Sequence, residues 1–239
     1  MKKKIIVTGG TGRFGNHLKN TVTKHNLFFP NKKEFNILNV SSMLKYFKKK
    51  KPDIVIHLAG LSRPMDLHEK DINKSINLNI IGTANVTMAC SQKNIKLIYF
   101  STNYVYPGIN GNYNEEDPLK PFNNYAWSKL GGECSVMLYK NSLILRTCMT
   151  EKPFIHKKAF ANVKTSFLYQ DEAAKILFKL LNKKGVINIG GKAQNIYNFA
   201  KKENKNVKKI YQNKNLKIKI PFDSTISIKK LKKILKIKF

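Results

Sequence analysis

Three apolar runs, separated by segments with helical spacing, constrain the fold of this chain more than any other feature. The runs cover residues 4–8, 53–59 and 95–100, and their apolar residues follow one another instead of alternating with polar ones. Continuous runs of this kind are typical of strands that are buried on both faces, as in a parallel sheet with helices on each side. The sequence therefore predicts an α/β fold with a parallel sheet.

A glycine-rich turn follows the first run and precedes a predicted helix over residues 14–23. Gly9, Gly12 and Gly15 are spaced three apart in this turn. Glycine permits unusual backbone angles, lets the main chain approach a pyrophosphate, and allows a helix to pack tightly on a strand. The turn therefore predicts a dinucleotide site, and the residues expected to contact the cofactor there are Gly9, Thr11, Gly12, Arg13, Phe14 and Gly15.

The segment after the predicted second strand indicates which dinucleotide is used. A carboxylate at this point holds the ribose hydroxyls of NAD and repels the extra phosphate of NADP. Here the chain reads Phe29-Pro30-Asn31-Lys32-Lys33, with no acidic residue before Glu34, and Arg13 adds a further cation. We therefore expect NADP(H) to be preferred, with NAD(H) as the alternative.

A tyrosine and a lysine on a predicted helix over residues 125–139 could move a proton beside that cofactor. Tyr125 and Lys129 are four residues apart, so their side chains project from the same helical face. A nearby ammonium favours the phenolate, and tyrosine can then protonate a carbonyl oxygen as hydride reaches the carbon. Thr102, which follows a buried strand, could hold the same carbonyl. The alternative interpretation is a surface pair on an amphipathic helix.

These segments, with several others, resemble the extended short-chain dehydrogenase/reductases, and within them the dTDP-4-dehydrorhamnose reductase group. The general motifs are Thr8-Gly9-x-x-Gly12-x-x-Gly15, Leu58-Ala59-Gly60, Asn79-x-x-Gly82-Thr83, Ser101-Thr102, Tyr125-x-x-x-Lys129 and Leu145-Arg146-Thr147. The narrower resemblance rests on Ser101-Thr102-Asn103-Tyr104-Val105-Tyr106-Pro107-Gly108, Tyr125-x-x-Ser128-Lys129-Leu130-x-Gly132-Glu133 and Pro221-x-Asp223-Ser224.

The resemblance implies a Rossmann-like doubly wound sheet with a small, shortened C-terminal substrate-binding region. It implies NAD(P)H-dependent reduction of a 4-keto group on a nucleotide-linked deoxyhexose, with Asn79 joining Thr102, Tyr125 and Lys129 as catalytic residues. Further cofactor contacts are then expected at Asn36, Ile37, Leu58, Ala59 and Gly60, and substrate contacts at Arg63, Asn103, Tyr104 and Lys152.

Two departures from the family pattern bear on the reaction. Asn103 and Tyr104 stand where a 4,6-dehydratase would carry its catalytic Asp-Glu pair, and a GDP-fucose synthase would carry cysteine in place of Tyr104. Only about 20 residues separate the segment after Arg146 from Tyr169, which leaves a reduced substrate lid. The alternatives that stay open are a sugar-nucleotide 4-epimerase with retained NAD and a non-catalytic NADP-binding regulatory subunit.

The same patterns predict a domain organisation. Residues 1–148 are expected to form the cofactor-binding domain, to which residues 165–191 return. Residues 149–164 and 192–239 are expected to form the small substrate-binding region.

Charge and composition limit the partners. The formal net charge is +31, but only Arg13, Arg63 and Arg146 among 45 basic residues are arginines. Nucleic-acid readout favours arginine, so we expect a solvated lysine surface and no nucleic-acid partner. The partner that the resemblance implies is a nucleotide-sugar substrate. No apolar run suggests a membrane span or signal peptide, so we expect no membrane partner and a cytoplasmic protein. Relatives often dimerise, which leaves a homodimer open.

The cysteine pattern supports neither a disulfide framework nor a metal site. Cys90, Cys134 and Cys148 are odd in number and widely spaced, without a Cys-x-x-Cys pair. We expect three buried free thiols and no bound metal.

Overall fold

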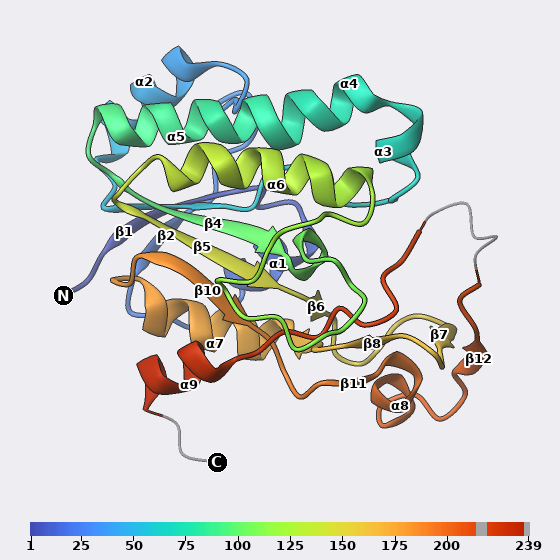
Figure 1. Ribbon diagram of the computed structural model, residues 1–239. Coiled ribbons are helices and arrows are strands. Elements are labelled where there is room, and N and C mark those ends of the chain that lie inside the picture. The colour runs from blue at the N-terminus through green and yellow to red at the C-terminus, as the bar shows by residue number, and fades with distance from the viewer. Residues whose placement is uncertain (214–218, 237–239) are drawn as a thin grey trace. The chain divides into compact units, whose positions relative to one another are not determined.

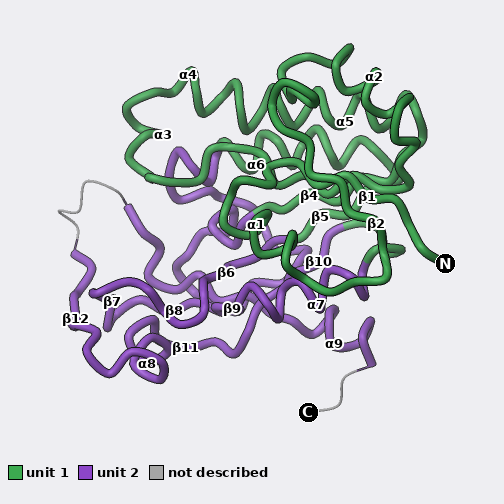
Figure 2. Tube along the Cα trace, turned by 180° about the vertical axis from the view of Figure 1, so that it is seen from behind, with its two compact units in different colours: residues 1–101, 128–145, 181–185 green, residues 102–127, 146–180, 186–239 purple. Residues whose placement is uncertain are grey.

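The structure is a computed structural model that describes residues 1–213 and 219–236 (Figure 1). The chain forms two compact units, which Figure 2 shows in different colours. Unit 1 contains residues 1–101, 128–145 and 181–185, and unit 2 contains residues 102–127, 146–180 and the described part of 186–239. The assignment of a cofactor-binding and a substrate-binding domain stays a prediction.

The central sheet confirms the predicted α/β fold. Among the described residues it has six strands in the order β10-β5-β4-β3-β1-β2. Parallel pairing is seen where Ile5 of β1 lies opposite Ile54 of β3, and where Val55 of β3 lies opposite Leu97 of β4. The strands are β1 (Lys4–Thr8), β2 (Asn26–Phe28), β3 (Ile54–His57), β4 (Lys96–Thr102), β5 (Ser142–Thr147) and β10 (Gly185–Ile189).

The burial of the strands agrees with their composition. Every residue of β3, β4 and β5 is buried, which is why these segments read as continuous apolar runs. Strand β1 lies between β2 and β3, so the connections after β1 and after β2 lead to opposite sides of it. In open α/β sheets, ligands bind at the carboxyl ends of strands at such a switch point. We therefore expect a ligand to bind at the carboxyl ends of β1 and β3.

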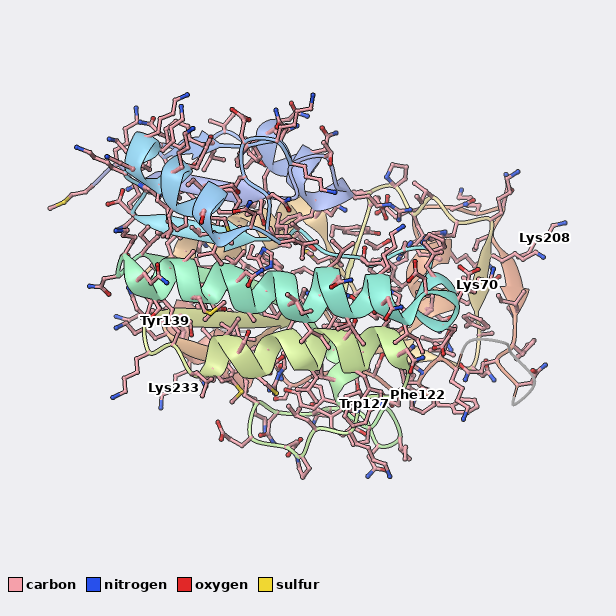
Figure 3. The ribbon with its side chains drawn as sticks, turned by 90° about the horizontal axis from the view of Figure 1, so that it is seen from above. Lys70, Phe122, Trp127, Tyr139, Lys208 and Lys233 are labelled. Carbon is pink, nitrogen blue, oxygen red and sulfur yellow. The ribbon has the colours of Figure 1, made fainter. Side chains whose placement is uncertain are left out.

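The helices of unit 1 follow the strands in the predicted alternation. They are α1 (Arg13–Lys19), α2 (Val40–Lys50), α3 (Leu67–Lys70), α4 (Ile72–Ser75), the π-helix η1 (Ile76–Ile81), α5 (Gly82–Gln92) and, from residue 128, α6 (Asn124–Met137). Segments α4, η1 and α5 form one continuous helical rod, and α5 and α6 lie side by side (Figures 1 and 3).

The first helix is shorter than predicted. The pattern predicted a helix to residue 23, but α1 ends at Lys19. The backbone N–H groups of Asn20 and Thr21 donate to His17 and Leu18, which tightens the last turn into i to i+3 bonds. The Thr21 hydroxyl also donates to the carbonyl of His17, at 3.0 Å. These bonds satisfy terminal carbonyls and end the helix.

Unit 2 contains a second hydrophobic core that the sequence patterns did not indicate. Phe199 is central to it, with ring centroids 5.0 Å from Tyr169, 5.3 Å from Phe167 and 6.4 Å from Phe154. Strands of two or three residues are too short to show periodicity. The elements of unit 2 are η2 (Asn103–Val105), β6 (Met149–Thr150), β7 (Lys158–Phe160), β8 (Lys164–Thr165), β9 (Leu168–Tyr169), α7 (Gln170–Leu180), β11 (Gln194–Asn195), α8 (Ile196–Lys201), β12 (Lys208–Ile210) and α9 (Lys229–Leu235).

The three lysines labelled in Figure 3 lie on the surface, whereas the three cysteines differ in burial. Figure 3 shows Lys70, Lys208 and Lys233 extending outward, and all three residues are exposed. Cys90 is buried, which raises the pKa of its thiol, and Cys148 is partly exposed. The expectation of three buried thiols is therefore confirmed only for Cys90; it is wrong for Cys148 and for Cys134, which lies on an exposed position of α6. No helix among the described residues is both long and apolar enough to span a bilayer.

The second core provides a test of the fold. Phe199 is 6% exposed, so Phe199→Ala should remove several ring contacts and lower the free energy of unfolding by about 3–5 kcal/mol. Phe222 is 44% exposed, so Phe222→Ala should cost about 1 kcal/mol or less. Urea unfolding of both variants measures the difference. Equal losses would contradict the packing described for Phe199.

Candidate active site

The glycine turn of unit 1 is built around close backbone contacts. Gly9 has a φ of +71°, and a Cβ atom there would lie 2.7 Å from the backbone nitrogen of Ala59, in the loop after β3. A Cβ on Gly15 would lie 2.3 Å from the carbonyl oxygen of Gly9. Gly9 also accepts a hydrogen bond from the backbone N–H of Gly12, at 2.9 Å. The protein itself therefore requires glycine at positions 9 and 15.

Gly12 lacks a comparable reason within the chain. Its φ is −72°, and a Cβ there would have one close neighbour, the carbonyl oxygen of Gly9 at 3.2 Å. Thr11, Gly12 and Arg13 are exposed, whereas Phe14 is buried and packs on Phe100, with ring centroids 5.2 Å apart. The exposed part of the turn thus has an open backbone surface at the end of β1.

Hydrogen bonds from the last residue of β1 hold the loop after β3 against the turn. The Thr8 hydroxyl oxygen accepts from the backbone N–H groups of Leu58 and Ala59, at 3.1 Å each. It also lies 2.8 Å from Nδ1 of His57. Burial, with a smaller contribution from Lys129, lowers the pKa of His57 to about 3, so this imidazole is neutral. The predicted cofactor residues Leu58, Ala59 and Gly60 therefore lie beside the glycine turn.

Asn79 connects this loop to α6. Its Oδ1 accepts from the backbone N–H of Leu61 at 2.7 Å, while Nδ2 donates to the Leu61 carbonyl and to the Ser128 hydroxyl, both at 2.8 Å. The side chain is 1% exposed and lies in the π-helix η1, a helix type frequently found at functional sites. A Cβ on Gly60 would lie 2.7 Å from Oδ1 of Asn79. The contacts fit the backbone-positioning role that the resemblance implies.

Lys129 lies one residue after Ser128 on the same helix. Its Nζ is 4.1 Å from the centroid of the Tyr99 ring, and the Tyr99 hydroxyl donates to the Lys129 carbonyl at 3.2 Å. Burial lowers the pKa of Lys129 to about 7, although the Glu133 carboxylate acts in the opposite direction. A lysine whose pKa is lowered this far is typical of a functional site.

The predicted cofactor contacts Asn36 and Ile37 also lie in unit 1. Ile37 is buried, and its carbonyl accepts from Nδ2 of Asn85 at 3.0 Å. The Asn36 side chain accepts from the backbone N–H of Leu38. Glu34 accepts from the backbone N–H of Asn31, so this carboxylate bonds to its own loop. A Cβ on Gly10 would lie 3.0 Å from the Phe29 ring, which places the segment after β2 beside the glycine turn.

Unit 2 brings Thr102 and Tyr125 to the same residue, Tyr104. The Thr102 hydroxyl oxygen accepts from the backbone N–H of Tyr104 at 3.3 Å, which starts the short helix η2. The Tyr104 and Tyr125 rings meet edge to face, with centroids 6.5 Å apart and an interplanar angle of 80°. Tyr125 also lies one turn before Lys129 along α6. Thr102 and Tyr125 therefore each contact Tyr104, Thr102 at its backbone and Tyr125 at its ring.

The predicted substrate contacts have other partners in the structure. Asn103 is 1% exposed, and its Nδ2 donates to the Ser224 carbonyl at 2.8 Å and to the Thr165 hydroxyl at 3.3 Å. Nζ of Lys152 lies 3.9 Å from a Glu203 carboxylate oxygen and 5.3 Å from the Tyr169 centroid. Arg63 is exposed in the segment between β3 and α3. Their roles in substrate binding stay predictions.

Sequence reasoning missed three residues that support the site. In the sequence, Ser128 lies within a motif that indicates no role for it, and His57 and Tyr99 lie within apolar strands. A polar side chain inside a fully buried run must find a hydrogen-bond partner, and that requirement could have identified them. Among the described residues, no group of three or more His, Cys, Asp or Glu side chains could hold a metal ion.

Comparison with known proteins gives two curated relatives and one solved structure of particular interest. Methionine adenosyltransferase 2 subunit beta of Pongo abelii is 28% identical over 144 residues, which is 56% of this chain and 43% of that protein. The dTDP-D-glucose 4,6-dehydratase of Dictyostelium discoideum is 32% identical over 189 residues, 62% of this chain and 43% of that protein. The chain thus spans less than half of the length of these relatives.

The solved structure is similar over nearly the whole chain. It is dTDP-4-dehydrorhamnose reductase from Bacillus anthracis str. Ames in complex with NADP, with a TM-score of 0.86 and 24% identity. The alignment covers 97% of this chain and 91% of that one, so the two share a fold. The family model described as the RmlD substrate binding domain matches residues 2–163. Because that match covers more than half of the 239 residues, the chain belongs to the RmlD substrate binding domain family.

Proposed function

We propose that the protein reduces the 4-keto group of a nucleotide-linked deoxyhexose with NADP(H). The observation that carries this proposal is that α6 bears Tyr125 and, one turn later, a partly buried Lys129 whose pKa is lowered to about 7. Family membership and the shared fold with a reductase solved with NADP support the same chemistry.

The residues present fit a nicotinamide dinucleotide. Gly12 is exposed, without a positive φ and with a single close neighbour within the chain, so close approach of a ligand accounts for glycine there. The backbone of the turn would hold the pyrophosphate. Arg13 and the lysines after β2 are cations that favour the extra phosphate of NADP(H). No acidic residue precedes Glu34, and the Glu34 carboxylate accepts from the backbone N–H of Asn31.

The catalytic roles follow from side-chain chemistry. Bound NADPH supplies the hydride that reaches the carbonyl carbon. Tyr125 donates its phenolic proton to the carbonyl oxygen, so that the ketone becomes a secondary alcohol and the tyrosine becomes a phenolate. The Lys129 ammonium stabilises that phenolate, and solvent returns the proton. Thr102 donates a hydrogen bond to the same carbonyl oxygen and polarises it. Asn79 positions the helix that carries Lys129 by its bond to Ser128.

The residues after Thr102 favour reduction over dehydration. Elimination of water needs an acid and a base, yet Asn103 and Tyr104 stand at those positions. The amide protons of Asn103 are donated to Ser224 and Thr165, so this side chain serves the local structure. We therefore prefer the reductase although one relative is a dehydratase.

A second candidate is a non-catalytic NADP-binding subunit. The similarity to methionine adenosyltransferase 2 subunit beta favours it, because that relative is a subunit of a different enzyme. Such a protein would bind NADPH without oxidising it in the presence of any sugar nucleotide. Binding and turnover therefore have to be measured separately.

The cofactor site is tested by a pair of glycine variants. We expect Gly12→Ala to fold and to weaken NADPH binding at least about tenfold, because the methyl group meets the ligand and has only one close neighbour in the protein, the Gly9 carbonyl oxygen at 3.2 Å. Gly9→Ala should instead lower the melting temperature, since its φ is +71° and its Cβ would contact Ala59. Fluorescence titration and thermal unfolding separate the two effects. Unchanged NADPH affinity in Gly12→Ala would remove this turn from the proposed site.

The general acid is tested by Tyr125→Phe, which removes only the phenolic hydroxyl. NADPH absorbance should be followed with dTDP-, UDP- and GDP-linked 4-keto-6-deoxyhexoses. We expect one of these sugars to be reduced, and Tyr125→Phe to be about 10²–10⁴-fold slower. Tyr211→Phe, at a tyrosine that is 64% exposed, is the matched control and should keep full activity. An equal rate in Tyr125→Phe would disprove the mechanism.

The lysine predicts a pH dependence. The Lys129 side chain is a charged ammonium below its pKa of about 7 and a neutral amine above it. Since the charged form stabilises the phenolate, kcat/KM should fall as pH rises through about 7, approaching tenfold per pH unit. Lys129→Arg keeps the charge, so any residual activity of that variant should lack this decline. A decline at the same pH in both proteins would assign it to another group.

A further inference from the structure

We propose that Tyr99 is a positioning residue that holds the Lys129 ammonium against the face of its aromatic ring. The functional consequence rests on the proposed role of Lys129 in the reaction. Two contacts carry the inference: Nζ of Lys129 lies 4.1 Å from the ring centroid, and the Tyr99 hydroxyl donates to the Lys129 carbonyl at 3.2 Å. One tyrosine thus contacts both the backbone and the charged end of the same lysine.

The Tyr99 ring is itself held rigidly. Tyr99 is fully buried in β4, and the His57 ring stacks on it, with centroids 5.8 Å apart and an interplanar angle of 28°. His57 is fixed in turn by Thr8 at 2.8 Å and by Thr83 at 3.2 Å. Because Thr8 also binds the loop after β3, the orientation of Lys129 is connected to the cofactor turn.

Glycine in α6 allows this contact. A Cβ on Gly132 would lie 2.8 Å from the Tyr99 hydroxyl and 2.5 Å from the carbonyl oxygen of Asn79. Gly131 has a similar role, since a Cβ there would lie 2.8 Å from Cδ1 of Ile80. The pair of glycines lets α6 approach both β4 and η1 closely.

The surrounding charges make the ring contact important. Burial disfavours the Lys129 ammonium, and Glu133 on α6 favours it. Burial, and to a smaller extent the charge of Lys129, lowers the pKa of His57 on β3 and of His68 on α3. Both imidazoles are therefore neutral at pH 7. Neutral imidazoles add no repulsion, so the negative face of the Tyr99 ring and the Glu133 carboxylate stabilise the charge.

The test replaces Tyr99 with phenylalanine and with phenylalanines carrying one, two or five ring fluorines. Fluorine weakens the negative face of the ring with little change of shape, and Tyr99→Phe controls for loss of the hydroxyl. The readout is the pH midpoint for acetylation of Lys129, followed by peptide mass spectrometry on the protein without substrate. This midpoint reports the protonation of the amine independently of turnover.

We expect the protonation constant of Lys129 to fall progressively with fluorination, by about 3- to 30-fold between phenylalanine and its pentafluoro form. A midpoint that stays constant across the series would overturn the proposal. If the pentafluoro variant fails to fold, the one- and two-fluorine variants decide by the same criterion. A graded midpoint in a protein that reduces no sugar nucleotide would support the role of Tyr99 and refute the proposed function alone.

Discussion

The contact between two backbone segments at Gly9 and Ala59 is the constraint on which the site of unit 1 depends. It requires a residue without a side chain at position 9, in a left-handed conformation that favours glycine. The Thr8 hydroxyl, which accepts from two amides of the same loop, keeps the segments together. With the ends of β1 and β3 joined in this way, the exposed backbone at Gly12 is left open at the switch point of the sheet.

Buried polar side chains extend this arrangement to the proposed catalytic lysine. His57 lies against Thr8 and stacks on Tyr99, whose ring contacts Lys129. Asn79 bonds both to Leu61 and to Ser128, the residue before Lys129. Satisfied networks of this kind fix a single geometry, because a buried polar group that loses its partner costs about 1–3 kcal/mol. Lys129 is thus held by its surroundings from two directions.

Most of the central architecture could be predicted from the sequence. Continuous apolar runs predicted the buried strands of the sheet, and the glycine spacing predicted the turn, because both depend on local residue types. The supporting contacts were not predictable in the same way. Whether His57 meets Thr8, or Tyr99 meets Lys129, depends on strand order and helix packing, which periodicity does not contain. The short strands of unit 2 gave no periodic signal, and the core around Phe199 was missed for that reason.

In the proposed reaction, hydride from NADPH is transferred to the 4-keto carbon of a sugar nucleotide while Tyr125 protonates the oxygen. The most direct measurement uses NADPH that carries deuterium at the transferable position, followed by mass spectrometry and NMR of the sugar product. We predict one deuterium per product molecule, bound at C4, and stoichiometric NADP⁺. A product without deuterium at C4, or epimerisation without net oxidation of NADPH, would contradict it.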